Sequence, residues 1–242
     1  MSQPDPSRAA HHLASYVPIL VHEIRTPLTA LRGSLGLLKG AVEDATAEVR
    51  DYATMADRNA AKLAALLDDV AEYEHLTGGG VEVRPEPVDL ADVIERAVEQ
   101  VQPVADERGV KLEVTSAVGE LNADARLLRD VVVRLLTYAV RVSPNASTVC
   151  VSCQQKPSDT CEQDAVRSVQ TVLDVTDCGR QVDASTAQRI FEPFSPAARR
   201  SASQQVRPGL DLAIAHAIAT VHGASLTFTT TTEGGKFTLQ LE

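Results

Sequence analysis

Two long apolar stripes near the N-terminus constrain the fold of this chain more than any other feature. In each stripe, apolar residues recur every three or four positions, which is the spacing of one face of an α-helix. The stripes consist of Val17, Leu20, Val21, Ile24, Leu28, Leu31, Leu35 and Leu38, and of Val49, Tyr52, Ala56, Ala60, Leu63, Leu67, Val70 and Tyr73. Two helices with one stripe each cannot close a core alone, whereas two such hairpins can form a four-helix bundle. We therefore predict an antiparallel helical hairpin that assembles as a homodimer.

The domain boundary is expected at the glycine triplet 78–80, where the second helix stops. Residues 1–79 would form the helical hairpin, with its first helix over residues 12–39, and residues 80–242 would form a second domain. In the second domain we predict strands at 81–84, 110–115, 148–154, 170–176, 225–231 and 236–241, and helices at 89–108, 124–142, 184–191 and 209–222. This mixed order predicts an α+β sandwich with helices on one face of a mixed or antiparallel sheet.

Composition excludes several classes of function. With 23 Lys and Arg against 33 Asp and Glu, the net charge of -10 disfavours binding to nucleic acid or to anionic membranes. No apolar run approaches the roughly 20 residues that span a bilayer, and no signal peptide is recognisable, so we expect a cytoplasmic protein. Cys150 and Cys153 lie in a strand-like run without a second closely spaced Cys/His pair, so we predict ordinary thiols and no metal site.

One histidine in the first helix is surrounded by polar groups. Glu23 follows His22 directly, Thr26 lies one turn away on the same face, and Pro27 should kink the helix. An exposed neutral imidazole with a neighbour that orients it and takes its proton can accept a phosphoryl group. On these residues alone, a structural histidine at the edge of an amphipathic helix is an equally good interpretation.

The stretch His22-Glu23-Ile24-Arg25-Thr26-Pro27-Leu28 resembles the H-box of two-component sensor histidine kinases, H-E-x-x-T/N-P-L. Residues 66–78 also resemble the end of the second dimerisation helix of that family, and the resemblance covers nearly the whole chain. It implies a dimerisation and histidine phosphotransfer domain followed by a histidine-kinase-like ATP-binding domain. His22 would be the phospho-acceptor and Glu23 its orienting base, while Thr26 would help to place water during dephosphorylation of a response regulator.

The segments that would hold magnesium and phosphate depart from the family pattern. Where active relatives have N-L-L-x-N-A, with asparagines for magnesium and nucleotide, this chain has Arg134 and Tyr138. The phosphate loop G-x-G-L-G-L retains only Gly209, because Arg207 and Asp211 replace the other glycines. A guanidinium has no lone pair for a metal, and a carboxylate at a helix N-terminus repels a triphosphate. Normal ATP-dependent catalysis is therefore not expected.

The adenine-binding segments are better preserved. Asp177, which in the family accepts a bond from the adenine amino group, and Gly179 are retained, but Gln181 replaces the second glycine of D-x-G-x-G. The F-box is intact at residues 190–194, and packing in the core is the safer explanation for its phenylalanines. The degenerate site would thus keep Asp177, Gly179 and Gly209 as its remaining nucleotide-binding residues.

Three hypotheses follow from this pattern. The first is a dimeric phosphorelay protein in which His22 exchanges a phosphoryl group with the aspartate of response-regulator receiver domains and needs no cofactor. The second is an active sensor kinase that uses ATP and magnesium in an atypical pocket, and the third is a non-catalytic dimeric interaction module. About 21 residues precede His22, so we expect either a fragment of a sensor or a protein signalled by a partner. The identity of the regulator, the upstream signal and the direction of transfer stay open.

Overall fold

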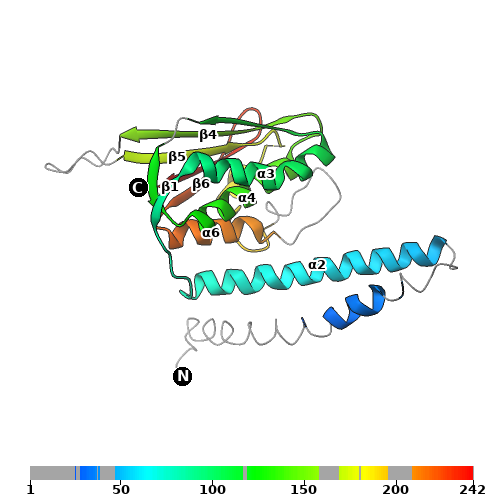
Figure 1. The fold of residues 1–242 in the computed structure, drawn as a ribbon. Helices are drawn as coiled ribbons and strands as arrows, with labels where there is room; N and C mark the ends of the chain where they lie inside the picture. Colours follow the sequence, from blue (N-terminus) through cyan, green and yellow to red (C-terminus); the bar gives the residue numbers. More distant parts are fainter. Residues whose placement is uncertain are drawn as a thin grey trace, which may run out of the picture. The chain divides into compact units, whose positions relative to one another are not determined.

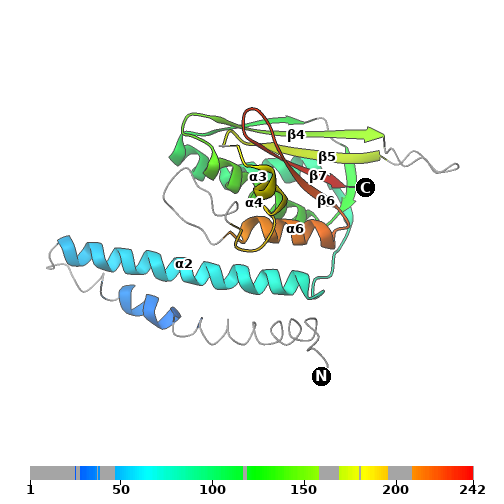
Figure 2. The same cartoon turned by 180° about the vertical axis from the view of Figure 1, so that it is seen from behind.

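The computed structural model describes residue 25, residues 28–36, residue 38, and the ranges 47–116, 119–157, 169–179, 181–195 and 209–241. The chain divides into two compact units, Met1–Gly80 and Val81–Glu242. Figures 1 and 2 show them from opposite sides. No helix among the described residues has the length and apolar character needed to cross a membrane.

The first unit is a helical hairpin. Its second helix, α2, spans Ala47–Thr77, and the described residues of the preceding arm, 28–36, are also helical. Arg25 of this arm forms an ion pair with Asp68 of α2, which joins the two arms. Leu28, Ala53, Ala60 and Leu76 are buried, whereas other apolar residues of the two arms are between 40% and 59% exposed, namely Leu31, Leu38, Val49, Tyr52, Met55 and Leu63.

The second unit is a five-stranded mixed sheet with helices on one face (Figure 1). The strand order is β2-β4-β5-β7-β6, in which β2 runs parallel to β4 and all other neighbours are antiparallel. The strands are β2 (Lys111–Ser116), β4 (Thr148–Pro157), β5 (Val169–Thr176), β6 (Ser225–Thr230) and β7 (Gly235–Leu241). The covering helices are α3 (Leu90–Arg108), α4 (Ala125–Val142) and α6 (Asp211–Val221). The predicted fold class, a helical hairpin followed by an α+β sandwich, is confirmed.

Local sequence explains where two covering helices begin. The Asp89 carboxylate accepts a bond from the amide of Ala91 at the start of α3, and the Asp124 carboxylate accepts bonds from the amides of Arg126 and Leu127 at the start of α4. Such caps satisfy amides that have no partner within the helix. The inner faces of α4 and of the central strands then form the core, with Leu135, Leu173 and Phe237 fully buried.

The prediction of a strand at residues 81–84 is wrong. The strand in this region is β1, Glu86–Asp89, which pairs with β3, Glu120–Ala123, in a separate two-stranded sheet. The apolar side chain of Val88 lies opposite Leu121 in this pairing. Arg84 instead directs its amide to the Asp124 carboxylate. The helix predicted at 184–191 is also shorter, because α5 spans only Ala184–Gln188.

Candidate functional site

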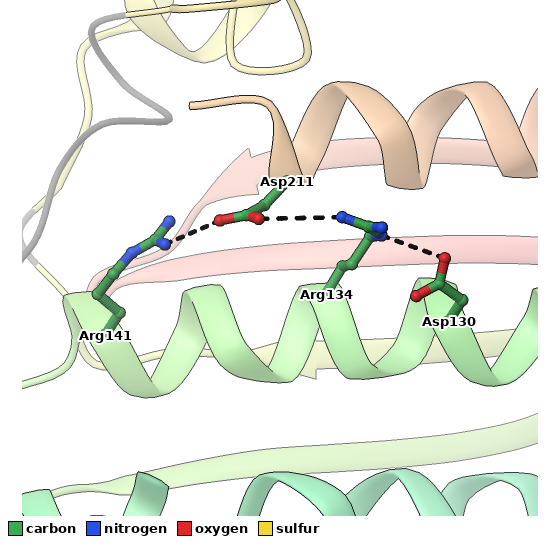
Figure 3. A network of polar contacts seen from close by, with 4 residues as sticks. All are labelled: Asp130, Arg134, Arg141 and Asp211. Carbon is green, nitrogen blue, oxygen red and sulfur yellow. Dashed lines mark hydrogen bonds and ion pairs between the residues drawn. The ribbon is translucent and has the colours of Figure 1, made fainter. Parts of the chain in front are cut away.

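The start of α6 lies beside one face of α4, and four charged side chains meet there (Figure 3). Asp130, Arg134 and Arg141 come from α4, at spacings of four and seven residues that place them on one face of the helix. Asp211 is the first residue of α6 and is buried. The preceding residue, Leu210, provides no side-chain cap for the helix. The structure thus brings together two of the substituted positions, Arg134 and Asp211, although they are far apart in the sequence.

The Asp211 carboxylate lies between two guanidinium groups. Its Oδ2 atom is 2.9 Å from Nη1 of Arg141, and its Oδ1 atom is 3.9 Å from Nη1 of Arg134. The Nε atom of Arg134 is in turn 3.2 Å from Oδ2 of Asp130. The side chains of Arg134, Arg141 and Asp211 are only 10–14% exposed, so water screens these charges weakly. We call this set of four residues the Asp211 network.

Arg141 is a member of the Asp211 network that sequence reasoning missed. The available signal was its position, seven residues after Arg134 and therefore on the same face of a strongly amphipathic helix. A buried guanidinium requires an anion, and the carboxylate at the start of α6 supplies it.

Tyr138, on the same helix, is part of the core. It is 2% exposed, and its ring meets that of Phe237 edge to face, with centroids 5.4 Å apart. The guanidinium carbon of Arg141 lies 5.3 Å from the centre of the Tyr138 ring. The edge-to-face contact stabilises the Tyr138 ring in the core, and the cation–π contact stabilises the Arg141 guanidinium beside it. The aromatic side chain at this position therefore has a packing role in the protein as it stands.

Asp177 is buried beside a tight group of glycines. Its Oδ1 atom accepts bonds from the amides of Gly179, at 2.7 Å, and Gly235, at 3.1 Å. Burial raises the pKa of Asp177, and these two amide bonds oppose the rise. A Cβ atom on Gly235 would lie 2.7 Å from Asp177 Oδ2, and one on Gly234 would lie 2.1 Å from the Asp177 carbonyl oxygen. Asp177 therefore has a structural role in this loop, in which it binds the amides of Gly179 and Gly235.

Gln181 is directed toward the β6–β7 hairpin. Its Nε2 atom donates to the carbonyl oxygens of Thr231, at 3.0 Å, and Thr232, at 3.4 Å. The substituted position therefore fastens the segment after β5 to the hairpin that precedes β7.

Gly209 and the F-box form the approach to α6. Gly209 has φ of +80°, a left-handed conformation that favours glycine, and its carbonyl oxygen accepts a bond from the amide of Phe194 at 3.2 Å. Phe191 stacks on His216 and contacts Phe237, as expected for a core residue. The core interpretation is wrong for Phe194, which is 44% exposed. Its φ of +59° lies in the left-handed region, which is uncommon for a residue other than glycine.

At the phospho-acceptor end, His22, Glu23 and Thr26 lie outside the described residues, and so does Arg207 of the phosphate loop. Among the described residues of this end, Arg25 is helical and forms its ion pair with Asp68. The assignment of His22, Glu23 and Thr26 therefore rests on the sequence.

The cysteines in the described part of the chain, Cys150, Cys153 and Cys178, form no cluster at the site. Cys150 and Cys153 lie on β4, the first exposed and the second buried, and burial raises the pKa of Cys153 to about 11. Cys178 is partly exposed and donates to the carbonyl oxygen of Thr148. Within the described parts of the chain, no group of three or more His, Cys, Asp or Glu side chains could hold a metal ion.

Comparison with known proteins matches one family model in each unit. Residues 14–79 match the His Kinase A (phospho-acceptor) domain, and residues 123–242 match the family of histidine kinase-, DNA gyrase B- and HSP90-like ATPases. The signal transduction histidine-protein kinase/phosphatase MprB of Mycolicibacterium smegmatis is 31% identical over 222 residues, which cover 88% of this chain and 41% of that protein. The non-motile and phage-resistance protein of Caulobacter vibrioides is 26% identical over 216 residues, covering 88% and 25%.

Among solved structures, full-length ShkA in complex with AMPPNP has a TM-score of 0.75 at 24% identity, covering 94% of this chain and 45% of that one. This similarity concerns the fold. The chain spans less than half the length of these relatives.

Proposed function

We propose that this chain, which belongs to the sensor histidine kinase family of two-component signalling systems, acts as a phosphorelay protein that does not use ATP. His22 would accept a phosphoryl group from the aspartate of one response-regulator receiver domain and return it to another. In the forward step the P–O bond of the aspartyl phosphate breaks and a P–N bond forms at His22, while Glu23 takes the proton from the imidazole.

The observation that carries this proposal is the Asp211 network. A magnesium ion needs oxygen or nitrogen lone pairs, whereas Arg134 offers only N–H donors. The start of α6, where free amides and the helix dipole would favour a phosphate, carries the Asp211 carboxylate instead. That carboxylate lies 2.9 Å from Nη1 of Arg141, so a side chain of the protein provides the negative charge where a bound nucleotide would provide its phosphate. These residues do not fit a magnesium triphosphate.

Exposed apolar side chains support a homodimer. Tyr52, Met55 and Leu63 of α2 are 52–59% exposed and recur at helical spacing along one side of the helix. A row of apolar residues left uncovered in one chain favours burial against a second copy. We propose that two hairpins form a four-helix bundle, which presents His22 to receiver domains.

The test of the proposal uses two phosphoryl donors. With radiolabelled ATP and magnesium, we expect no acid-labile, base-stable label on the purified protein. With a phosphorylated receiver domain, we expect label that disappears in the His22→Ala variant. Label from ATP that depends on His22 would contradict the proposal and support an active kinase.

The retained Asp177 is the observation that favours the kinase alternative. Saturable binding of ATP that is lost in Asp177→Ala, in a variant shown to be folded, would support it. Normal signalling by His22→Ala would instead support a non-catalytic interaction module. Loss of receiver dephosphorylation in Thr26→Ala alone would add a phosphatase role.

A further inference from the structure

His222 links the end of α6 to the start of α4. Its Nε2 atom accepts a hydrogen bond of 3.0 Å from the backbone amide of Asp124, which lies 98 positions earlier in the sequence. The Asp211 network joins the same two helices at the start of α6. An imidazole nitrogen accepts a hydrogen bond through its lone pair, which a proton would occupy. The contact with Asp124 therefore requires the neutral form of His222.

Asp124 extends this contact to the segment that enters the second unit. Its Oδ1 atom caps α4, and its Oδ2 atom accepts a bond from the amide of Arg84 at 3.3 Å. Residues 81–84 open the second unit and follow directly on the first. One aspartate thus holds the connection between the units through its side chain and contacts His222 through its backbone amide.

The charges around His222 favour one response to protonation. The carboxylate of Asp124 acts on the imidazole and attracts its protonated form. Burial raises the pKa of the Asp124 carboxyl, but amide bonds and the charge of Arg126 bring it below its usual range, so it stays ionised in mild acid. Arg84 directs its guanidinium to Glu82, and both side chains are at least 80% exposed. The strand β6, which packs against α6, has no charged residue in its sequence. Further titratable residues of the adjoining elements are Glu86 on β1, Glu120 on β3, Arg129 and Asp130 in the first half of α4, and His216 on α6.

We propose that His222 is an acid-sensitive switch that controls how firmly residues 81–84 are held at the start of the second unit. When His222 takes a proton from water, both ring nitrogens become N–H donors, and Nε2 then meets the Asp124 amide as donor against donor. The ionised Asp124 carboxylate is an acceptor in the same residue, so the imidazolium competes for Oδ2 with the amide of Arg84. Loss of that amide bond frees the connection between the units.

The surroundings of the imidazole set the direction of this switch. Burial lowers the pKa of His222, and the Asp124 charge and the Ile218 carbonyl group oppose this effect without cancelling it. The native state therefore keeps His222 neutral at neutral pH, and proton uptake favours the open arrangement as the pH falls below about 6.5. The buried Nδ1 atom has no hydrogen bond of normal geometry with any described residue, so the bond at Nε2 is the contact that fixes the ring.

The experiment follows the exchange of individual amides of the full chain in heavy water by NMR, at about pH 7.5 and about pH 5.5. The protection factor compares each amide with a free peptide at the same pH, which removes the intrinsic effect of pH on exchange. His222→Gln introduces a neutral side chain whose carbonyl oxygen can accept from the Asp124 amide at either pH. His216→Gln is the matched control, because burial also lowers the pKa of this second α6 histidine, but its ring stacks on Phe191.

The expected change follows from proton binding to the open arrangement. A proton that binds this arrangement with the ordinary histidine pKa of 6.5 favours opening by up to about tenfold at pH 5.5. We therefore expect the protection factors of the Arg84 and Asp124 amides to fall about three- to tenfold in the wild type and in His216→Gln. In His222→Gln they should change less than about twofold. At neutral pH the ring of His222 should carry its proton on Nδ1, a tautomer that nitrogen NMR identifies, because Nε2 is the acceptor.

An equal fall in His222→Gln and in the wild type would overturn the inference, and so would wild-type protection factors that do not change with pH. If His222→Gln does not fold, the wild type decides, because the Arg84 and Asp124 amide signals should move with the same midpoint pH as the His222 ring. A different midpoint, or a proton on Nε2 at neutral pH, would also contradict the switch. None of these outcomes depends on whether His22 accepts a phosphoryl group.

Discussion

Replacing Asp211 with Asn tests how much the Asp211 network contributes to the free energy of unfolding. Asparagine has nearly the same shape but no charge, so the buried Arg141 guanidinium loses its ion pair at 2.9 Å. Breaking a buried ion pair by removing one partner costs about 3–5 kcal/mol. Since the Arg141 and Asp211 side chains keep about 10% exposure and Arg134 keeps its contact with Asp130, we expect the lower end, about 3 kcal/mol.

The free energy of unfolding is measured by urea titration, monitored by circular dichroism, on the full chain. For a domain of this size, a loss of 3 kcal/mol should lower the melting temperature by roughly 6–12 °C. Asp92→Asn provides the control, because its ion pair with Arg96 is 54–61% exposed and should contribute under about 1 kcal/mol.

A loss below about 1 kcal/mol in Asp211→Asn, equal to that of the control, would refute the reasoning. It would mean that Arg141 finds water or another partner at no cost, and that the Asp211 network does not hold α6 against α4. A double-mutant cycle with Arg141→Gln separates the ion pair from other effects of each substitution.

Three further predictions concern other parts of the second unit. Burial lowers the pKa of His222, so the native state binds a proton at this residue less readily than the unfolded state does. The free energy of unfolding should therefore fall as the pH drops below about 6.5. Urea titrations of His222→Gln should show a smaller loss of stability over this pH range. Gly234→Ala should destabilise the protein by several kcal/mol in thermal unfolding, since the new Cβ would lie 2.1 Å from a backbone oxygen. Gly33→Ala is the control, because there is open space around Gly33 and the substitution should be neutral or stabilising. With a thiol reagent at pH 8, mass spectrometry should show labelling of exposed Cys150 well before buried Cys153, whose pKa is about 11.

The sequence predicted those parts of the fold whose causes are local. The helix predicted at 89–108 corresponds to α3, because the Asp89 cap and the apolar pattern after it act over a few residues. The small sheet of β1 and β3 escaped prediction because Val88 is paired with Leu121, more than thirty residues away. The alternating residues 81–84 were predicted as a strand, but a strand needs a neighbour to pair with. In this region it is β1, residues 86–89, that pairs with β3.

In the candidate site, too, local features could be predicted from the sequence, whereas contacts between distant segments could not. Comparison with the family motifs identified Arg134 and Asp211 as two separate substitutions, each unfavourable to nucleotide binding by its own chemistry. That the two departures compensate each other could not be predicted, because their contact depends on how α6 packs on α4. Arg141 was missed for the same reason: an arginine on an amphipathic helix is ordinarily exposed, whereas this one is buried and paired with Asp211 of α6.

The compensation within the Asp211 network also sets how weakly the site should bind a triphosphate. A phosphate that takes the place of the Asp211 carboxylate beside Nη1 of Arg141 must displace that carboxylate, which costs about 3–5 kcal/mol and weakens binding roughly 10²- to 10⁴-fold. Asp211→Gly removes the competing anion and restores a glycine at the start of α6, so this variant should bind magnesium-free ATP more tightly than the wild type. Isothermal titration at a temperature where both proteins are folded measures the change, and Asp211→Gly combined with Arg141→Gln should lose the gain. Equal affinity in the wild type and in Asp211→Gly would mean that the carboxylate does not occupy the position of a phosphate, and the case against ATP would then rest on Arg134 and magnesium alone.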